Sequence, residues 1–206
     1  FNLLNKIKED MNQGILIYKI DFSKKELEIL SNLSLITSKP TIYAANISED
    51  DLLTNNNQQA LKTREYANKN NCEYIQLCGK IEMEISRLEK EDKDDFLAMY
   101  SLKDSALNML IKSSYKLLGL QTFFTAGEKE IRAWTIRLND NAYDAAGKIH
   151  TDFQKGFIKA EVYHYSDLIK YNNELAVKEA GLIKQEGKEY IVKDGDIMLF
   201  KFNVTS

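Results

Sequence analysis

Apolar side chains recur at helical spacing at the start of the sequence. This spacing predicts an amphipathic helix whose buried face carries Leu3, Leu4, Ile7 and Met11. Ser23 and Glu26 stand three residues apart, as in a capping box, and predict the start of a second helix. The apolar positions of that helix are Leu27, Leu30 and Leu33. Helical character should stop before Pro40, because proline biases the preceding residue toward extended backbone.

After Pro40 the pattern changes to short strands that alternate with helices. Apolar runs predict buried strands at residues 41–45 and 74–77, with a helix around residues 61–66 between them. A strand, a helix and a strand at this spacing predict a parallel pair. Two further helices are expected, at about residues 81–89 and 104–118. Gly119 would end the second of them in a left-handed conformation.

Strands dominate the pattern from residue 120 onward. They are predicted at residues 120–125, 130–136, 157–163, 189–192 and 197–202, with one helix at residues 142–149. Asp194-Gly195 is a tight-turn dipeptide between the last two predicted strands. The sequence therefore predicts an α/β front part and an α+β rear part, in which a small mixed sheet packs over one helix.

Composition supports a division into two parts and limits the partners. Of the nine glycines, seven fall at or after Gly119, which marks the change to a turn-rich rear part. The net charge is −3, and both parts are mildly acidic, so the overall charge does not favour non-specific binding to nucleic acid.

The spacing of Cys72 and Cys78 fits neither a redox pair nor a zinc knuckle. No apolar run approaches the roughly 20 residues that cross a bilayer. A cytoplasmic protein with no membrane contact is expected.

A set of motifs in the rear part carries the most specific signal. They occur in a fixed order at residues 120–127, 130–135, 145–157, 190–196 and 200–204. This order resembles the TGS domain that ends the YchF/Obg-like ATPases. The resemblance implies a ubiquitin-like β-grasp fold for residues 120–206, and contact with the ribosome or with RNA.

Two loops in the front part extend this resemblance. Ligands bind beyond the carboxyl ends of parallel strands, and both loops follow predicted strands. Asn46-Ile47-Ser48-Glu49 resembles the family's Asn-x-x-Glu, which stands in place of the guanine-reading Asn-Lys-x-Asp of ordinary GTPases. Cys78-Gly79-Lys80 matches the second base loop. The resemblance implies base contacts from Asn46, Ile47, Glu49, Cys78, Gly79 and Lys80.

The chemistry of these residues bears on which base is bound. An asparagine amide both donates and accepts hydrogen bonds, so Asn46 can bond a purine edge while it ties the loop to neighbouring backbone. An aspartate can accept two bonds from the ring N–H and the amine of guanine, whereas adenine offers no such pair on that edge. Glu49 in the aspartate position and Ile47 in the lysine position remove the guanine-specific arrangement. ATP over GTP is what the resemblance implies.

The elements that would hold the phosphates are missing from the sequence. No G-x-x-x-x-G-K-S/T motif occurs, and Asp144-Ala145-Ala146-Gly147 has the letters of a magnesium switch but falls inside a predicted helix. Phosphoryl transfer needs positioned phosphates and Mg²⁺, so no catalytic or metal-binding residue is expected, and the chain should not hydrolyse ATP by itself. The Mg²⁺ ligands would belong to a longer parent. Because the sequence begins with Phe1 rather than methionine, a fragment or a processed product is expected. The resemblance implies the second half of a full-length member of the family.

The resemblance implies three domains. Residues 1–37 would end a helical, coiled-coil insertion; residues 38–119 would be the last part of a partial P-loop nucleotide domain; and residues 120–206 would be the TGS domain.

Simpler interpretations stand beside these assignments. Asn46 could be an ordinary turn former and Cys78 a small buried thiol. His150 and Asp152 stand two residues apart, but no nucleophile accompanies them, and His150 is expected to interact with the last carbonyls of the preceding helix. Contact with RNA or the ribosome is expected from Arg132, Lys148, His150, Lys155 and Lys159, although such side chains are more often a solvated surface.

Three hypotheses therefore remain. The first is the C-terminal half of a ribosome-associated ATPase that carries the base loops. The second is a free-standing TGS module that binds RNA or protein without nucleotide. The third, a regulatory domain of a larger enzyme such as a threonyl-tRNA synthetase or a stringent-response enzyme, ranks last, because the catalytic motifs of those enzymes are absent from the sequence. The oligomeric state does not follow from the sequence.

Overall fold

The computed structural model describes residues 2–127 and 130–203, and the chain divides into two compact units. The front unit comprises residues 1–118 and the rear unit residues 119–206. Phe1 and Val204, which the sequence analysis named, lie outside the described residues. Each unit has buried apolar clusters of its own, so each is considered separately.

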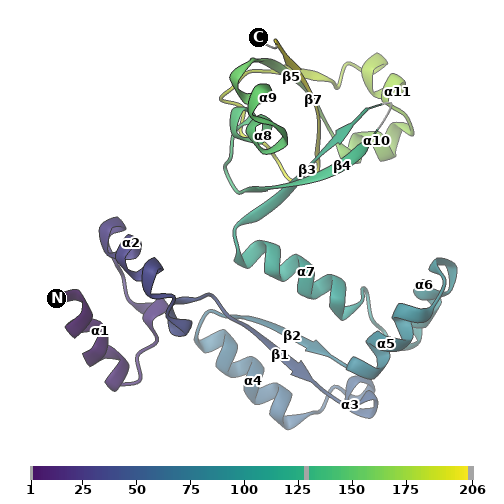
Figure 1. Cartoon of the computed structure of the whole chain (residues 1–206). Helices are drawn as coiled ribbons and strands as arrows, with labels where there is room; N and C mark the ends of the chain where they lie inside the picture. The colour runs from purple at the N-terminus through teal and green to yellow at the C-terminus, as the bar shows by residue number, and fades with distance from the viewer. Residues whose placement is uncertain (1, 128–129, 204–206) are drawn as a thin grey trace. The chain divides into compact units, whose positions relative to one another are not determined.

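The front unit contains α-helices, two short 3-10 helices and a pair of strands (Figure 1). In chain order they are α1 (Asn2–Asn12), η1 (Ile17–Lys19), α2 (Lys24–Leu33), η2 (Ile36–Ser38), β1 (Ile42–Asn46), α3 (Glu49–Thr54), α4 (Gln58–Lys69), β2 (Glu73–Leu77), α5 (Gly79–Arg87), α6 (Lys90–Met99) and α7 (Ala106–Leu117).

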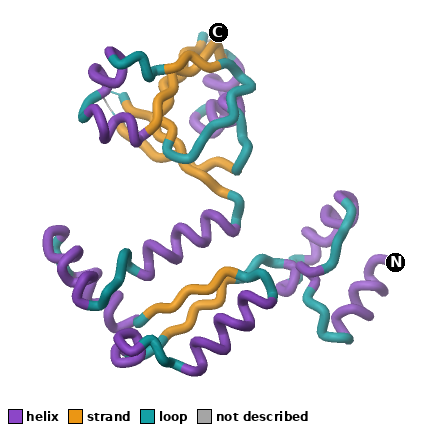
Figure 2. The backbone as a smooth tube through the Cα atoms, turned by 180° about the vertical axis from the view of Figure 1, so that it is seen from behind, coloured by secondary structure: helices purple, strands orange, loops and turns teal. Residues whose placement is uncertain are grey.

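Strands β1 and β2 are parallel, and α4 forms the crossover between them. The register runs from Ile42 opposite Glu73 to Asn46 opposite Leu77, so both strands end at the same edge. Helices α4 and α7 lie on opposite sides of the pair (Figures 1 and 2). Ile75 in β2 is fully buried between these layers. The parallel pair predicted from the sequence is confirmed.

Side-chain caps explain where several front helices begin. The Ser23 N–H and hydroxyl both donate to the Glu26 carboxylate, at 2.8 and 2.7 Å, which confirms the predicted capping box of α2. Glu82 of α5 accepts the backbone N–H groups of Ala106 and Leu107 at 2.7 and 3.1 Å. A carboxylate at this position satisfies N–H groups that the first turn of α7 leaves unpaired. These two hydrogen bonds therefore hold the start of α7 against α5.

The rear unit is a mixed sheet with helices on both faces (Figure 1). Its elements in chain order are β3 (Leu120–Ala126), β4 (Ile131–Arg137), α8 (Ala142–Ile149), α9 (Thr151–Lys155), β5 (Phe157–His164), α10 (Tyr165–Tyr171), α11 (Glu174–Glu179), β6 (Lys184–Glu186) and β7 (Asp196–Phe202). In the described part of this unit the strand order is β4-β3-β7-β5-β6. Only the β3–β7 pair is parallel within that order.

Alternate side chains of the sheet build two separate cores. Phe123, Val162 and Phe200 point to the face that α8 covers, and all three are buried. Tyr163 and Ile197, each next to a residue of the first core, point to the other face. There they pack with residues from α10, α11 and the following loop. This two-residue period is what a sheet buried on both faces requires.

The prediction of a strand at residues 189–192 is wrong. The strand beside β5 is β6, and Ile191 forms only an isolated bridge with Asn141. The backbone of this segment instead serves the start of α8, because the carbonyl of Tyr190 accepts from the N–H of Ala142 at 2.8 Å. Gly195 has a φ of +87°, so the predicted turn exists, but it leads into β7 without joining two strands.

Among the described residues, five α-helices were not predicted, namely α3, α6, α9, α10 and α11, and neither were the 3-10 helices η1 and η2. Most of them are only five to seven residues long, too short for apolar periodicity to define a face. Helix α6 has ten residues, and charged side chains fill most of its first turns. In contrast, α8 spans the predicted residues 142–149, and Gly119 has the expected positive φ of 62°.

None of the helices in residues 2–127 and 130–203 is both long and apolar enough to cross a membrane.

Gly156 should be essential for the stability of the rear unit. It follows α9, and its carbonyl accepts the Asn203 N–H at 2.9 Å, so a Cβ at this position would overlap the backbone of Asn203. We expect Gly156→Ala to lower the free energy of unfolding by about 1–3 kcal/mol.

Trp134, the only tryptophan, lies in this unit, so its fluorescence during denaturant unfolding reports the loss. Gly187→Ala is the control, because open space surrounds Gly187. Equal unfolding midpoints for both variants would contradict this expectation.

Candidate functional site

Asn46 and Gly79 join the two loops that follow the parallel strands. Asn46 is the last residue of β1, and Gly79 is the first residue of α5, one position after the Cys78 cap. The Gly79 N–H donates to Asn46 Oδ1 at 3.0 Å. The Ile47 N–H donates to the Leu77 carbonyl at 2.9 Å, so the strands stay paired up to this point. The two loops are therefore held as one surface.

This hydrogen bond also fixes the orientation of the Asn46 amide. A backbone N–H can only donate, so the atom facing Gly79 must be the amide oxygen. The amide nitrogen Nδ2 has no hydrogen-bond partner among residues 2–127 and 130–203, and the Asn46 side chain is exposed. Asn46 thus presents two N–H donors to solvent at the end of the parallel pair.

The side chains of Ile47 and Cys78 point into the unit. Ile47 is 8% exposed and Cys78 is 5% exposed. Cys78 packs with Ile81 and Ile85 in an apolar cluster, which agrees with its interpretation as a small buried thiol. At these two positions the backbone is the part that remains available to a ligand.

Glu49 lies at the start of α3, and both of its carboxylate oxygens are occupied. Lys80 Nζ lies 2.7 Å from Oε2, and the Tyr100 hydroxyl donates to Oε1 at 2.7 Å. The hydrogen bonds from Lys80 and Tyr100 hold the pKa of the Glu49 carboxyl below its usual value. The same contacts raise the pKa of Lys80 and of Tyr100.

Tyr100 is a site residue that the sequence analysis missed. It follows α6, a helix that was not predicted, and it is separated from Glu49 by 51 positions. Its ring lies 5.3 Å from that of Phe96, measured between ring centroids, and packs against the cluster around Cys78. No local sequence pattern connects Tyr100 with Glu49.

The loop before α3 is braced by its own polar side chains. The hydroxyl of Ser48 accepts the Asp51 N–H at 3.1 Å and donates to the Asp51 carboxylate at 2.8 Å. Asn57 donates to the same carboxylate at 2.9 Å. The hydrogen bonds from Asn57 and Ser48 lower the pKa of the Asp51 carboxyl. These bonds restrain the segment between β1 and α3, which connects Asn46 with Glu49.

The five residues expected to contact RNA or the ribosome do not lie on one face of the rear unit. Arg132 shares a side of the sheet with Trp134, and its guanidinium carbon lies 4.2 Å from the Trp134 ring centroid. Lys148 on α8 and Lys155 on α9 are exposed on the helices that cover this side. Lys159 alternates with Ala160 of the α8 core, so it points to the opposite side.

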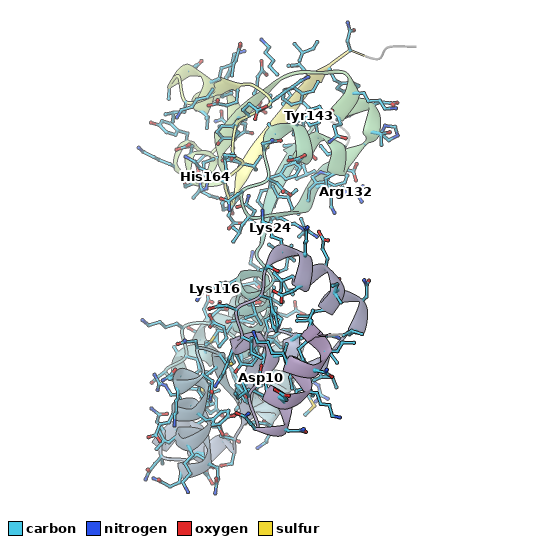
Figure 3. The ribbon with its side chains drawn as sticks, turned by 90° about the vertical axis from the view of Figure 1, so that its left-hand side faces the viewer. Asp10, Lys24, Lys116, Arg132, Tyr143 and His164 are labelled. Atoms are coloured by element: carbon cyan, nitrogen blue, oxygen red, sulfur yellow. The ribbon has the colours of Figure 1, made fainter. Side chains whose placement is uncertain are left out.

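His150 caps a helix, but not the expected one. Its Nδ1 atom accepts the Asp152 N–H at 3.1 Å at the start of α9. The expectation that the ring would interact with the last carbonyls of the preceding helix is therefore wrong. His164 is the last residue of β5, and it lies apart from Arg132 in the view of Figure 3. The described residues contain no group of three or more His, Cys, Asp or Glu that could hold a metal ion.

Comparison with known proteins relates both units to one family. The family model YchF-GTPase_C, described as "Protein of unknown function (DUF933)", matches residues 120–203. A curated protein of Bacillus subtilis, "Ribosome-binding ATPase YchF", is 45% identical over 205 residues, covering 99% of this chain and 56% of that protein. "Obg-like ATPase 1" of Rattus norvegicus is 41% identical over 208 residues, covering 98% of this chain and 52% of that protein.

A solved structure gives the same result. The Schizosaccharomyces pombe YchF GTPase superposes with a TM-score of 0.83 at 35% identity, covering 97% of this chain and 53% of the other. The chain belongs to the YchF/Obg-like family. It spans about half the length of the curated family members it matches, and corresponds to their C-terminal half.

The Glu49 carboxyl should titrate below the usual glutamate value of 4.5. Because its folded-state pKa is depressed, its ion pair stabilises the fold above the unfolded pKa and is lost as the pH falls through the folded pKa. We expect Lys80→Met to raise the pKa of Glu49 toward the ordinary value, measured by NMR of the side-chain carboxyl carbon.

Lys62→Met is the matched control, because it removes the same charge from an exposed position on α4. It should leave the Glu49 titration unchanged. An ordinary Glu49 pKa in the unaltered chain would show that the pair with Lys80 does not form in solution.

Proposed function

We propose that this chain contributes the base-recognition part of a purine-nucleotide site in a ribosome-associated ATPase. The observation that carries the proposal is the exposed Asn46 amide, fixed by Gly79 so that its N–H donors face outward. Atom N7 of a purine is an acceptor that such a donor can bond. The position at the carboxyl ends of two parallel strands is where α/β proteins bind ligands.

Preference for ATP over GTP would come from Glu49. Adenine and guanine both present N7, so Asn46 alone does not distinguish them. A guanine-reading carboxylate needs both oxygens for the two donors of guanine, and both oxygens of Glu49 are engaged by Lys80 and Tyr100. The relatives from Bacillus subtilis and Rattus norvegicus are named ATPases, while the solved relative is named a GTPase.

Hydrolysis is not proposed for this chain alone. The sequence has no phosphate-binding G-x-x-x-x-G-K-S/T motif, and phosphoryl transfer depends on holding the phosphates and Mg²⁺ in place. Its role would be to bind and orient the base. ATP with Mg²⁺ would be held jointly with residues outside this sequence.

The rear unit is proposed to be a TGS domain that contacts the ribosome. Its mixed sheet, with α8 packed across one face, fits a β-grasp arrangement. Arg132, Lys148 and Lys155 are exposed on the α8 side and would meet RNA phosphates. A ribosome-bound protein of this kind would work in the cytoplasm. His150 and Lys159 would have at most peripheral contacts.

A second candidate is an interaction module that binds RNA or protein without nucleotide. The observation in its favour is the arginine–tryptophan pair at the exposed strand β4, which is a surface suited to stacking on its own. Nucleotide would then have no effect on ribosome binding.

Nucleotide affinity should depend on the free donors of Asn46. Asn46→Asp keeps an acceptor for the Gly79 N–H but removes the two outward donors. We expect the affinity of the natural protein carrying this sequence for ATP to fall by about tenfold in Asn46→Asp and in Asn46→Ala. Titration of a fluorescent adenine nucleotide measures it.

Asn32→Ala serves as the control, since Asn32 is exposed on α2 and bonds only a carbonyl of its own helix. Unchanged affinity in both Asn46 variants would remove the base-site assignment, whereas a loss in Asn46→Ala alone would assign Asn46 a purely structural role.

Ribosome binding should depend on the basic side chains of the α8 side. We expect the chain to sediment with ribosomes at low salt, where electrostatic contacts are strongest. The triple variant Arg132→Gln, Lys148→Gln, Lys155→Gln should lower that affinity by about tenfold or more. Neutralising Lys24, Lys62 and Lys90 in the front unit is the control. Absence from the ribosomal pellet at low salt would contradict the proposal.

A further inference from the structure

Tyr100 is the only residue beyond α6 that reaches the Glu49 carboxylate in the described part of the chain. Its hydroxyl donates to Oε1 at 2.7 Å, while Lys80 occupies Oε2 at the same distance. Glu49 is a third exposed, so without these partners its side chain would be free to rotate. The two bonds hold the carboxylate in one orientation.

The position of Tyr100 is itself fixed by packing. Its ring contacts Phe96 at 5.3 Å between centroids and lies against the cluster of Cys78, Ile81 and Ile85. Its N–H donates to the Leu97 carbonyl at 3.2 Å at the end of α6. Because Cys78 directly precedes Gly79, this cluster also supports the loop that bonds Asn46. Tyr100 is therefore a rigid donor attached to the base loops.

We propose that Tyr100 is a specificity-determining positioning residue, which acts with Lys80 to hold the Glu49 carboxylate away from guanine. This inference rests on the proposed nucleotide site. Tyr100 need not touch the base, because it acts through Glu49.

The physical reason is competition for the two carboxylate oxygens. Reading guanine requires both oxygens to accept the ring N–H and the exocyclic amine together. To do so, Glu49 would have to give up or share two short hydrogen bonds. One is the charge-assisted bond from Lys80, and the other is the bond from the Tyr100 hydroxyl. Adenine has no such pair of donors on that edge, so its binding makes no demand on Glu49. The bond from Tyr100 therefore weakens GTP binding more than ATP binding.

The test is the ratio of GTP to ATP affinity in the natural protein carrying this sequence. Tyr100→Phe removes only the hydroxyl and keeps the ring that packs on Phe96. We expect the ratio of GTP to ATP affinity to rise by about threefold to tenfold, which corresponds to the net contribution of one typical hydrogen bond. The double variant Tyr100→Phe, Lys80→Met should raise it further. Tyr165→Phe, at a half-exposed ring in the rear unit, is the control.

A second readout separates release of Glu49 from any general loss of structure. The pKa of the Glu49 carboxyl, followed by carbon NMR, should rise in Tyr100→Phe while the unfolding midpoint changes little. If Glu49 is released and the affinity ratio stays constant, Tyr100 does not determine specificity and the nucleotide site stands. If the unaltered protein binds neither ATP nor GTP, the proposed function fails and this inference fails with it.

Discussion

The hydrogen bond from the Gly79 N–H to Asn46 Oδ1 is the constraint on which the front unit's candidate site depends. It connects the ends of two parallel strands that are 33 positions apart in sequence, and it decides which half of the Asn46 amide faces solvent. Burial of Cys78 next to Gly79 and of Ile47 next to Asn46 keeps both ends of the bond in place. A short polar contact thus turns two loops into one surface with outward N–H donors.

In the rear unit, a long irregular segment between β6 and β7 has to be held against the sheet. Buried polar side chains do this through bonds to backbone: Gln121 donates to the Val192 carbonyl at 2.8 Å, and the Asp196 carboxylate accepts from the Lys193 N–H at 2.8 Å and also from the Tyr190 hydroxyl at 2.9 Å. Burial and this bond raise the pKa of Tyr190. Buried groups without such partners would destabilise the fold, so the segment has one conformation that pairs them. The exposed basic side chains then lie on a rigid support.

Local patterns predicted the features that depend on neighbouring residues, and missed those that depend on distant ones. The parallel strands, the Ser23 cap and helix α8 follow from spacing and capping alone, and the structure confirms them. The segment at residues 189–192 reads as a strand, but its carbonyls are needed at the start of α8, which no local pattern reveals. Tyr100 was missed for the same reason, because only packing brings it to Glu49. The base role of Asn46 and its neighbours stays a prediction.

The most direct test of the central claim is a crystal structure of the natural protein carrying this sequence with a non-hydrolysable ATP analogue. The account predicts that Asn46 Nδ2 lies within hydrogen-bonding distance of the purine N7, while Oδ1 keeps its bond to Gly79. Lys80 and Tyr100 should still hold Glu49. An adenine bound elsewhere, with the Asn46 amide left facing solvent, would contradict the account.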